Sequence, residues 1–155
     1  MSVETQNRDS RETQRVADGG RKERRMRVVL ADDHEAVVQA AAALLVSKFE
    51  VVGTASDGPS LVECALRLEP DVVVVDISMP GYSGIEAMKR MKAAGLEAKV
   101  VFLTVHDDPD FARAALALGT AGYVVKPRMA SDLIPAIQQA IAGRSFISPS
   151  VAAQL

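Results

Sequence analysis

The sequence predicts an α/β fold in which a doubly wound, five-stranded parallel sheet carries helices on both faces. Between Met26 and Gly143, short apolar runs alternate five times with longer segments whose apolar residues recur at helical spacing. The central run, residues 71–75, is one aspartate followed by four valines, and such β-branched residues suit a strand buried on both faces of a parallel sheet. Alternation with short connections produces parallel strands joined by right-handed crossovers.

The expected elements follow one another as five strand–helix pairs. The strands are expected at residues 26–31, 51–55, 71–75, 99–104 and 121–125. The helices are expected at residues 35–48, 59–68, 84–94, 109–118 and 132–142. Helical spacing is clearest at Val37, Ala41, Leu44 and Leu45 in the first helix, and at Ile134, Ile137 and Ile141 in the last.

Proline, serine and glycine punctuate this pattern. Pro59 and Pro109 suit the first turn of a helix, and Ser83 with Glu86 forms the pattern of a capping box. Pro135 conflicts with the pattern, because it lies about four residues into the last expected helix. Three glycines suit helix C-termini: Gly95, Gly119 and Gly143.

Composition limits the classes of function. A chain of 155 residues with 48% hydrophobic residues can bury one full core, and no apolar run approaches the ~20 residues that a membrane helix needs. A single cysteine, Cys64, agrees with a reducing cytoplasm. Residues 1–25 are polar, with seven Lys/Arg and five Asp/Glu, and predict a flexible tail. The remainder holds 11 basic and 15 acidic residues, which argues against direct nucleic-acid binding by the folded part.

Charged and hydroxyl side chains follow four of the expected strands. Asp32 and Asp33 follow the first, Asp76 follows the third, Thr104 ends the fourth and Lys126 follows the fifth. In open α/β sheets, ligands bind outside the carboxyl ends of the strands. Clustered carboxylates repel one another unless a cation joins them, and an all-oxygen ligand set suits Mg²⁺. We therefore expect one reactive rim at this end of the sheet.

In this order and at these strand ends, the residues resemble the receiver domain of two-component response regulators, over roughly residues 27–143. The resemblance implies a flavodoxin-like (βα)5 fold with strand order 2-1-3-4-5. It makes Asp76 the phosphoacceptor, which takes a phosphoryl group from a sensor histidine kinase, and it makes Lys126 a contact of that group. Thr104 and Tyr123 fall on the switch positions that remodel the surface of the fourth helix, fifth strand and fifth helix. The protein is then a regulator that assists its own phosphorylation and dephosphorylation, and not an enzyme.

The same resemblance implies a metal site and a way of tuning it. Asp33, Asp76 and the backbone carbonyl of Ser78 are expected to bind Mg²⁺ directly, with Asp32 acting through water. Val105 stands where the family more often has a small residue, so it is expected to narrow access to the phosphoryl group. The two histidines, His34 and His106, are expected to be loop residues that line the entrance.

The resemblance also divides the chain. Residues 1–25 are expected to be the tail, 26–143 the receiver domain, and 144–155 the start of a linker toward a LuxR-like helix-turn-helix output domain that is missing here. We then expect transcription control in the cytoplasm, possible homodimerisation on phosphorylation, DNA contact only through the missing domain, and no membrane contact.

Three alternatives remain open at this point. The chain could be a stand-alone receiver that signals through protein contacts. A haloacid-dehalogenase-type phosphatase would need a second aspartate at position 78, which is Ser78. A flavin-binding protein would need a Ser/Thr/Gly-rich phosphate loop after the first strand, where Asp32 and Asp33 would repel a phosphate.

Overall fold

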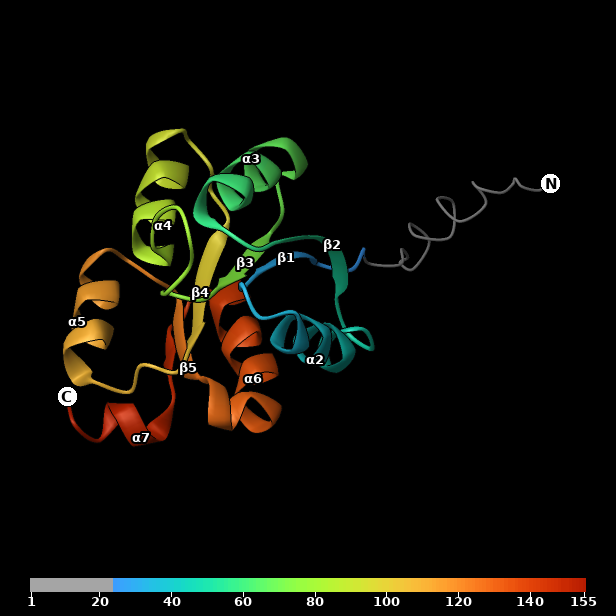
Figure 1. The fold of residues 1–155 in the computed structure, drawn as a ribbon. Helices are drawn as coiled ribbons and strands as arrows, with labels where there is room; N and C mark the ends of the chain where they lie inside the picture. Colours follow the sequence, from blue (N-terminus) through green and yellow to red (C-terminus); the bar gives the residue numbers. More distant parts are fainter. Residues whose placement is uncertain (1–23) are drawn as a thin grey trace.

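The computed structural model describes residues 24–155, so the expected tail lies almost wholly outside the described residues (Figure 1). Parallel strands form one sheet in the order β2-β1-β3-β4-β5-β6. The strands are β1 (Arg27–Ala31), β2 (Glu50–Ala55), β3 (Val72–Val75), β4 (Lys99–Thr104), β5 (Gly122–Val125) and β6 (Phe146–Ile147). The helices are α2 (Glu35–Leu45), α3 (Gly58–Leu68), α4 (Gly84–Ala93), α5 (Pro109–Ala117), the 3₁₀ turn η1 (Lys126–Arg128), α6 (Met129–Ile141) and α7 (Pro149–Ala152). The predicted fold class and the order of the first five strands are confirmed.

Helices cover both faces of the sheet, which gives three layers. Figure 1 shows α2 and α6 on one face and α3, α4 and α5 on the other. The side chains of the central strands alternate between two cores: Val73 and Val75 pack in the core under α3, α4 and α5, whereas Val72 and Val74 pack in the core under α2 and α6. This double burial explains why the strand is a continuous run of valines.

The local signals at helix ends act as the sequence predicts. Pro59 and Pro109 lie in the first turns of α3 and α5. The Ser83 side chain caps α4 by accepting a hydrogen bond from the Glu86 amide at 3.1 Å. The glycines after α4, α5 and α6 all have positive φ angles, which L-residues with a Cβ rarely adopt: Gly95, Gly119 and Gly143.

Two helices differ from their predicted bounds by three residues at one end. Helix α2 ends at Leu45, three residues early, because the chain turns there to bury Phe49, whose amide donates to the Leu45 carbonyl at 2.8 Å. Helix α6 begins at Met129, directly after η1, so Pro135 is its seventh residue. Pro135 is exposed, and so is Ser131 one turn earlier, so water can reach the backbone carbonyl that the proline leaves without an amide partner.

The sheet also has a sixth strand that the sequence analysis did not predict. Residues Phe146–Ile147 pair in parallel with Gly122 and Tyr123 of β5. A strand of two residues is too short to produce a periodic pattern, so nothing in the sequence marks it. Within residues 24–155, no helix combines the length and the apolar character needed to cross a membrane.

Candidate functional site

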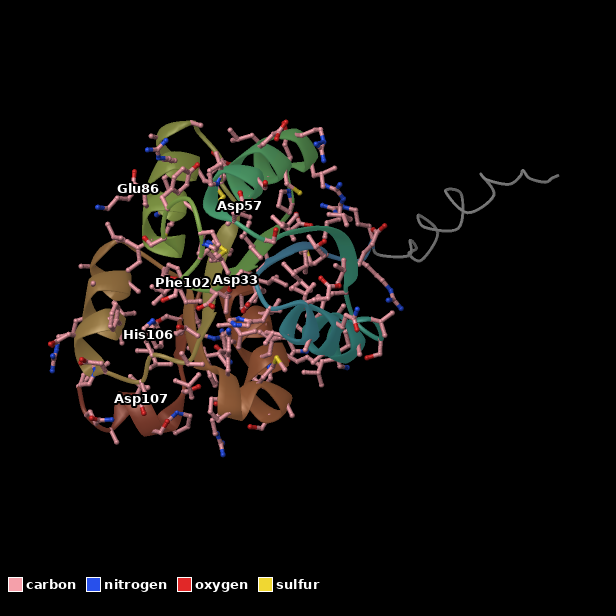
Figure 2. The ribbon with its side chains drawn as sticks, in the orientation of Figure 1. Asp33, Asp57, Glu86, Phe102, His106 and Asp107 are labelled. Carbon is pink, nitrogen blue, oxygen red and sulfur yellow. The ribbon has the colours of Figure 1, made fainter. Side chains whose placement is uncertain are left out.

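The predicted rim forms at the carboxyl ends of β1, β3, β4 and β5. Parallel pairing sets Ala31 of β1 beside Val75 of β3, and Thr104 of β4 beside Val125 of β5. The residues that come next along the chain therefore leave the sheet at one edge. Figure 2 labels Asp33 and His106, which follow β1 and β4 at this edge.

Lys126 joins two of the rim carboxylates. Its Nζ lies 2.7 Å from Oδ2 of Asp32 and 3.0 Å from Oδ2 of Asp76, and its side chain is 12% exposed. Burial lowers the pKa of Lys126, but the contacts with the two carboxylates outweigh burial and raise the pKa above its ordinary value. The ammonium is therefore charged at neutral pH.

Three carboxylates and one imidazole cluster at the rim beside Lys126. Ligand atoms of Asp32, Asp33, Asp76 and His34 all lie within 4.8 Å of one another. Nδ1 of His34 is 3.2 Å from Oδ1 of Asp32 and also 3.2 Å from Oδ1 of Asp33. Oδ2 of Asp32 is buried against the Lys126 ammonium, 2.7 Å away. Three clustered carboxylates against one ammonium leave excess negative charge, and their oxygen donors fit a hard divalent cation such as Mg²⁺.

Asp76 is held by the backbone around it. Its amide donates to the Ala31 carbonyl at 3.0 Å, which fixes the residue beside β1. Its Oδ1 accepts a hydrogen bond from the Ser78 amide at 3.3 Å, which places Ser78 next to the carboxylate. Asp76 is 3% exposed. Both carboxylate oxygens therefore have fixed partners, Ser78 on one and Lys126 on the other.

Gly84 allows α4 to begin against Asp76. A Cβ built on Gly84 would lie 2.2 Å from the Asp76 carbonyl oxygen, closer than any real contact. The Gly84 amide donates to the Ile77 carbonyl at 2.7 Å, which holds this close approach. The sequence analysis treated Gly84 only as part of a capping pattern. The signal that it missed is the glycine itself: at a helical position glycine is less stabilising than a residue with a side chain, so its presence indicates that a side chain would not fit.

Thr104 and His106 connect the loops after β3 and β4. Thr104 is fully buried, and its Oγ1 accepts a hydrogen bond from the His106 amide at 3.2 Å, which leaves the hydroxyl proton free to be donated. Nε2 of His106 and Oγ of Ser78 share a hydrogen bond at 2.8 Å. The His106 ring stacks on Phe111 of α5, with centroids 4.3 Å apart. His106 is therefore more than an entrance residue, because it ties two loops of the rim together.

Tyr123 is already inside the protein in this structure. It is fully buried, and its hydroxyl donates to the His106 carbonyl at 2.8 Å. Burial, followed by the negative charges of Asp107, Asp108 and Asp76, raises the pKa of the hydroxyl. The family resemblance implies that Tyr123 repacks inward on phosphorylation, whereas in this structure its hydroxyl already has a defined inward partner, the His106 carbonyl.

The rim is a shallow charged surface. A small hollow of about 260 Å³ lies beside Asp32, between Thr54 and Ser60. A larger hollow of about 780 Å³ lies at the opposite end of the sheet, against Met26, Pro70 and Lys99, far from the carboxylates of the rim. The rim therefore suits a small ionic group better than a deeply enclosed cofactor.

Comparison with known proteins identifies the family. The family described as "Response regulator receiver domain" matches residues 28–138. The chain belongs to this family. The receiver domain is 35% identical over 132 residues to "Response regulator GacA" of Pseudomonas aeruginosa, covering 84% of this chain and 62% of that protein. The chain thus spans about three fifths of the length of the curated relatives that it matches.

Solved structures agree with this assignment. The receiver domain superposes on a two-component response regulator of the LuxR family from Aurantimonas sp. SI85-9A1 with a TM-score of 0.80 and 32% identity, covering 84% of this chain and 94% of that one. It superposes on the isolated REC domain of RcsB from Salmonella enterica serovar Typhimurium, determined with the phosphomimetic BeF3⁻, with a TM-score of 0.79 and 30% identity, covering 85% and 99%. The predicted receiver domain of the LuxR type is therefore confirmed.

Proposed function

We propose that this receiver domain accepts a phosphoryl group on Asp76 from a phosphohistidine of a sensor histidine kinase. The observation that supports this most directly is Lys126, which is held between Asp32 and Asp76 at the ends of parallel strands. A carboxylate oxygen of Asp76 attacks phosphorus while the phosphorus–nitrogen bond breaks. The bond's electron pair returns to the imidazole of the kinase, which takes up a proton, and the product is an acyl phosphate. This transfer depends on position and on charge neutralisation more than on covalent assistance.

The other rim residues arrange this transfer. Asp33, Asp76 and the backbone carbonyl of Ser78 would hold Mg²⁺, with Asp32 acting through a water ligand. When bound, Mg²⁺ neutralises charge on the phosphoryl oxygens. Lys126 neutralises a further oxygen as a point charge, and Thr104 has a hydroxyl proton free to donate.

The consequence of phosphorylation is a change of surface. The acyl phosphate adds up to about two negative charges at the rim. Thr104 moves toward the new group, and Tyr123 and the loop at His106 repack with it, because Thr104 Oγ1, the His106 backbone and the Tyr123 hydroxyl are joined by hydrogen bonds. The surface of α5, β5 and α6 then differs between the unphosphorylated and phosphorylated states. Phosphorylation acts by shifting the population from one conformation to the other.

The output we propose is transcription control through a LuxR-like DNA-binding domain beyond residue 155. The support is that relatives such as GacA are longer than this chain. The protein is then a regulator that assists its own phosphorylation and dephosphorylation. A stand-alone receiver that signals through protein contacts is the second candidate. Under the first proposal, phosphorylation changes self-association of this chain, measured by sedimentation with BeF3⁻, and the chain alone shows no sequence-specific DNA binding in a titration.

A mass measurement tests the assignment of Asp76. The chain is incubated with a small phosphodonor and Mg²⁺, and the intact mass is followed for the wild type and for Asp76→Asn. The wild type gains the mass of one phosphoryl group, and the variant gains none. Asp57→Asn is the matched control, because Asp57 is a half-buried residue that caps α3 and asparagine caps equally well, so this variant gains the full mass. Full gain by Asp76→Asn would refute the assignment.

A further inference from the structure

Residues 146–152 fold back onto the receiver domain. The Phe146 amide donates to the Ala121 carbonyl at 3.1 Å, and the Ser148 amide donates to the Tyr123 carbonyl at 2.9 Å. Helix α7 follows at once, and its Val151 is fully buried in the same core as Tyr123. Figure 1 shows α7 beside α5, at the edge of the sheet farthest from β2. This segment, which we name the clasp, is therefore bound by backbone pairing and by an apolar anchor.

A buried polar pair locks the clasp. Ser148 is fully buried, its Oγ donates to Oδ2 of Asp132 at 2.8 Å, and the same Oγ accepts a hydrogen bond from the Val125 amide at 3.2 Å. Asp132, in the first turn of α6, is 4% exposed. Its other contacts are Ser131 Oγ at 2.9 Å and Arg128 Nε at 3.5 Å. A buried carboxylate needs such donors, so its stability depends on Ser148 and Arg128 remaining in place.

Ser148, one member of this buried pair, also contacts the backbone of β5, which leads directly into the candidate site. Ser148 binds β5 twice, at the Tyr123 carbonyl and at the Val125 amide. Val125 directly precedes Lys126, whose ammonium contacts Asp76. Tyr123 is the residue whose hydroxyl reaches the loop after β4. A shift at the end of β5 therefore changes both hydrogen bonds that Ser148 makes with β5.

We propose that the clasp is coupled to the rim and opens when Asp76 is phosphorylated, an inference that rests on the proposed function of Asp76. The direction follows from the connection through β5. A phosphoryl group on Asp76 attracts the Lys126 ammonium, and Lys126 directly follows Val125, so the end of β5 moves toward the rim. This movement lengthens the hydrogen bond from the Val125 amide to Ser148 Oγ and weakens the attachment of the clasp to the sheet. The orientation of everything beyond residue 152 then depends on the state of the rim.

Hydrogen exchange of the full chain, with and without BeF3⁻ and Mg²⁺, measures this coupling. We expect the protected amides of Phe146, Ser148 and Val151 to exchange at least about fivefold faster with BeF3⁻. A factor of about five is the lower end of the coupling usually measured between two sites in one protein. Residues of β2, on the other edge of the sheet, keep their exchange rates. Unchanged or slower exchange in the clasp, while residues 76–78 respond to BeF3⁻, would overturn the clasp proposal alone. No response anywhere would remove the proposed function as well.

A serine variant tests the lock. Ser148→Ala should raise exchange of the clasp about tenfold without BeF3⁻, and because coupling is reciprocal it should bind BeF3⁻ about threefold more tightly than the wild type. Ser150→Ala is the matched control in the same segment, since Ser150 is exposed and its hydroxyl makes no hydrogen bond among the described residues. The control should match the wild type in both measurements. Equal exchange in Ser148→Ala and Ser150→Ala would show that the Ser148–Asp132 pair does not hold the clasp. If Ser148→Ala fails to fold, the comparison of wild-type exchange with and without BeF3⁻ still tests the proposal.

Discussion

Replacement of Lys126 by alanine removes the only cation that contacts both Asp32 and Asp76 among the described residues. Both carboxylates are almost fully buried, and Asp33 lies beside them. Breaking a buried ion pair by removing one partner usually costs about 3–5 kcal/mol. This site lies at the rim, where water and cations can reach it, so we expect a loss of about 3 kcal/mol in the free energy of unfolding, the lower end of that range.

Magnesium should reverse part of this loss. A ligand that binds only the folded state stabilises it by about 2.7 kcal/mol at one hundred times its dissociation constant. Without the Lys126 ammonium, a divalent cation meets less repulsion, so Mg²⁺ should stabilise Lys126→Ala more than it stabilises the wild type. Under the proposed function, the variant should nevertheless take up little phosphoryl group, because it lacks the ammonium assigned to neutralise a phosphoryl oxygen.

Urea unfolding with and without Mg²⁺, together with phosphoryl uptake by intact mass, measures both effects. Lys99→Ala is the matched control, because Lys99 is an exposed lysine at the other end of β4 and its loss should change stability by no more than about 0.5 kcal/mol. Wild-type stability and normal uptake in Lys126→Ala would show that the two carboxylates do not depend on this ammonium. That result would refute the electrostatic account of the rim.

Three further predictions concern separate parts of the protein. Asp33→Ala should weaken Mg²⁺ binding about tenfold or more, followed by amide shifts near the rim, and equal affinity would exclude Asp33 as a ligand. Burial raises the pKa of Asp71, but hydrogen bonds led by the one from the Arg27 amide outweigh burial and lower it, so its stabilisation is complete above the unfolded pKa and is lost as pH falls through the folded pKa. Asp71→Asn should therefore cost about 1–2 kcal/mol in urea unfolding at pH 7 and progressively less as the pH falls below about 4, and a loss independent of pH would contradict the assignment. Gly84→Ala should cost about 2–3 kcal/mol in thermal or urea unfolding, because its Cβ meets the Asp76 carbonyl, and a neutral result would mean that α4 moves freely.

The sequence predicts the rim well because strand ends in a parallel sheet are fixed by simple rules. Valine runs locate the strands, and the residue after each run must reach the same edge. Asp76 and Lys126 can therefore be placed together from the sequence alone. The strand order itself came from the family resemblance, because periodicity does not say which strands are neighbours.

The features that the sequence did not predict are contacts between loops and close approaches of backbone. The hydrogen bond between His106 and Ser78 joins residues 28 positions apart, and no local pattern indicates it. The close approach at Gly84 depends on where α4 meets the end of β3. The burial of Ser148 depends on Asp132 of a neighbouring helix. Such contacts are consequences of tertiary packing and carry no periodic signature.

The two-residue length of β6 also bears on how these molecules behave toward one another. A long, bare edge strand offers a row of free amide and carbonyl groups on which a second chain can add, and this is a common route to aggregation. Here β6 covers part of β5, and Pro149 follows one residue after β6 ends. Proline has no amide hydrogen and cannot extend a ladder. The sheet thus finishes on this side in a strand too short to act as a template for further chains.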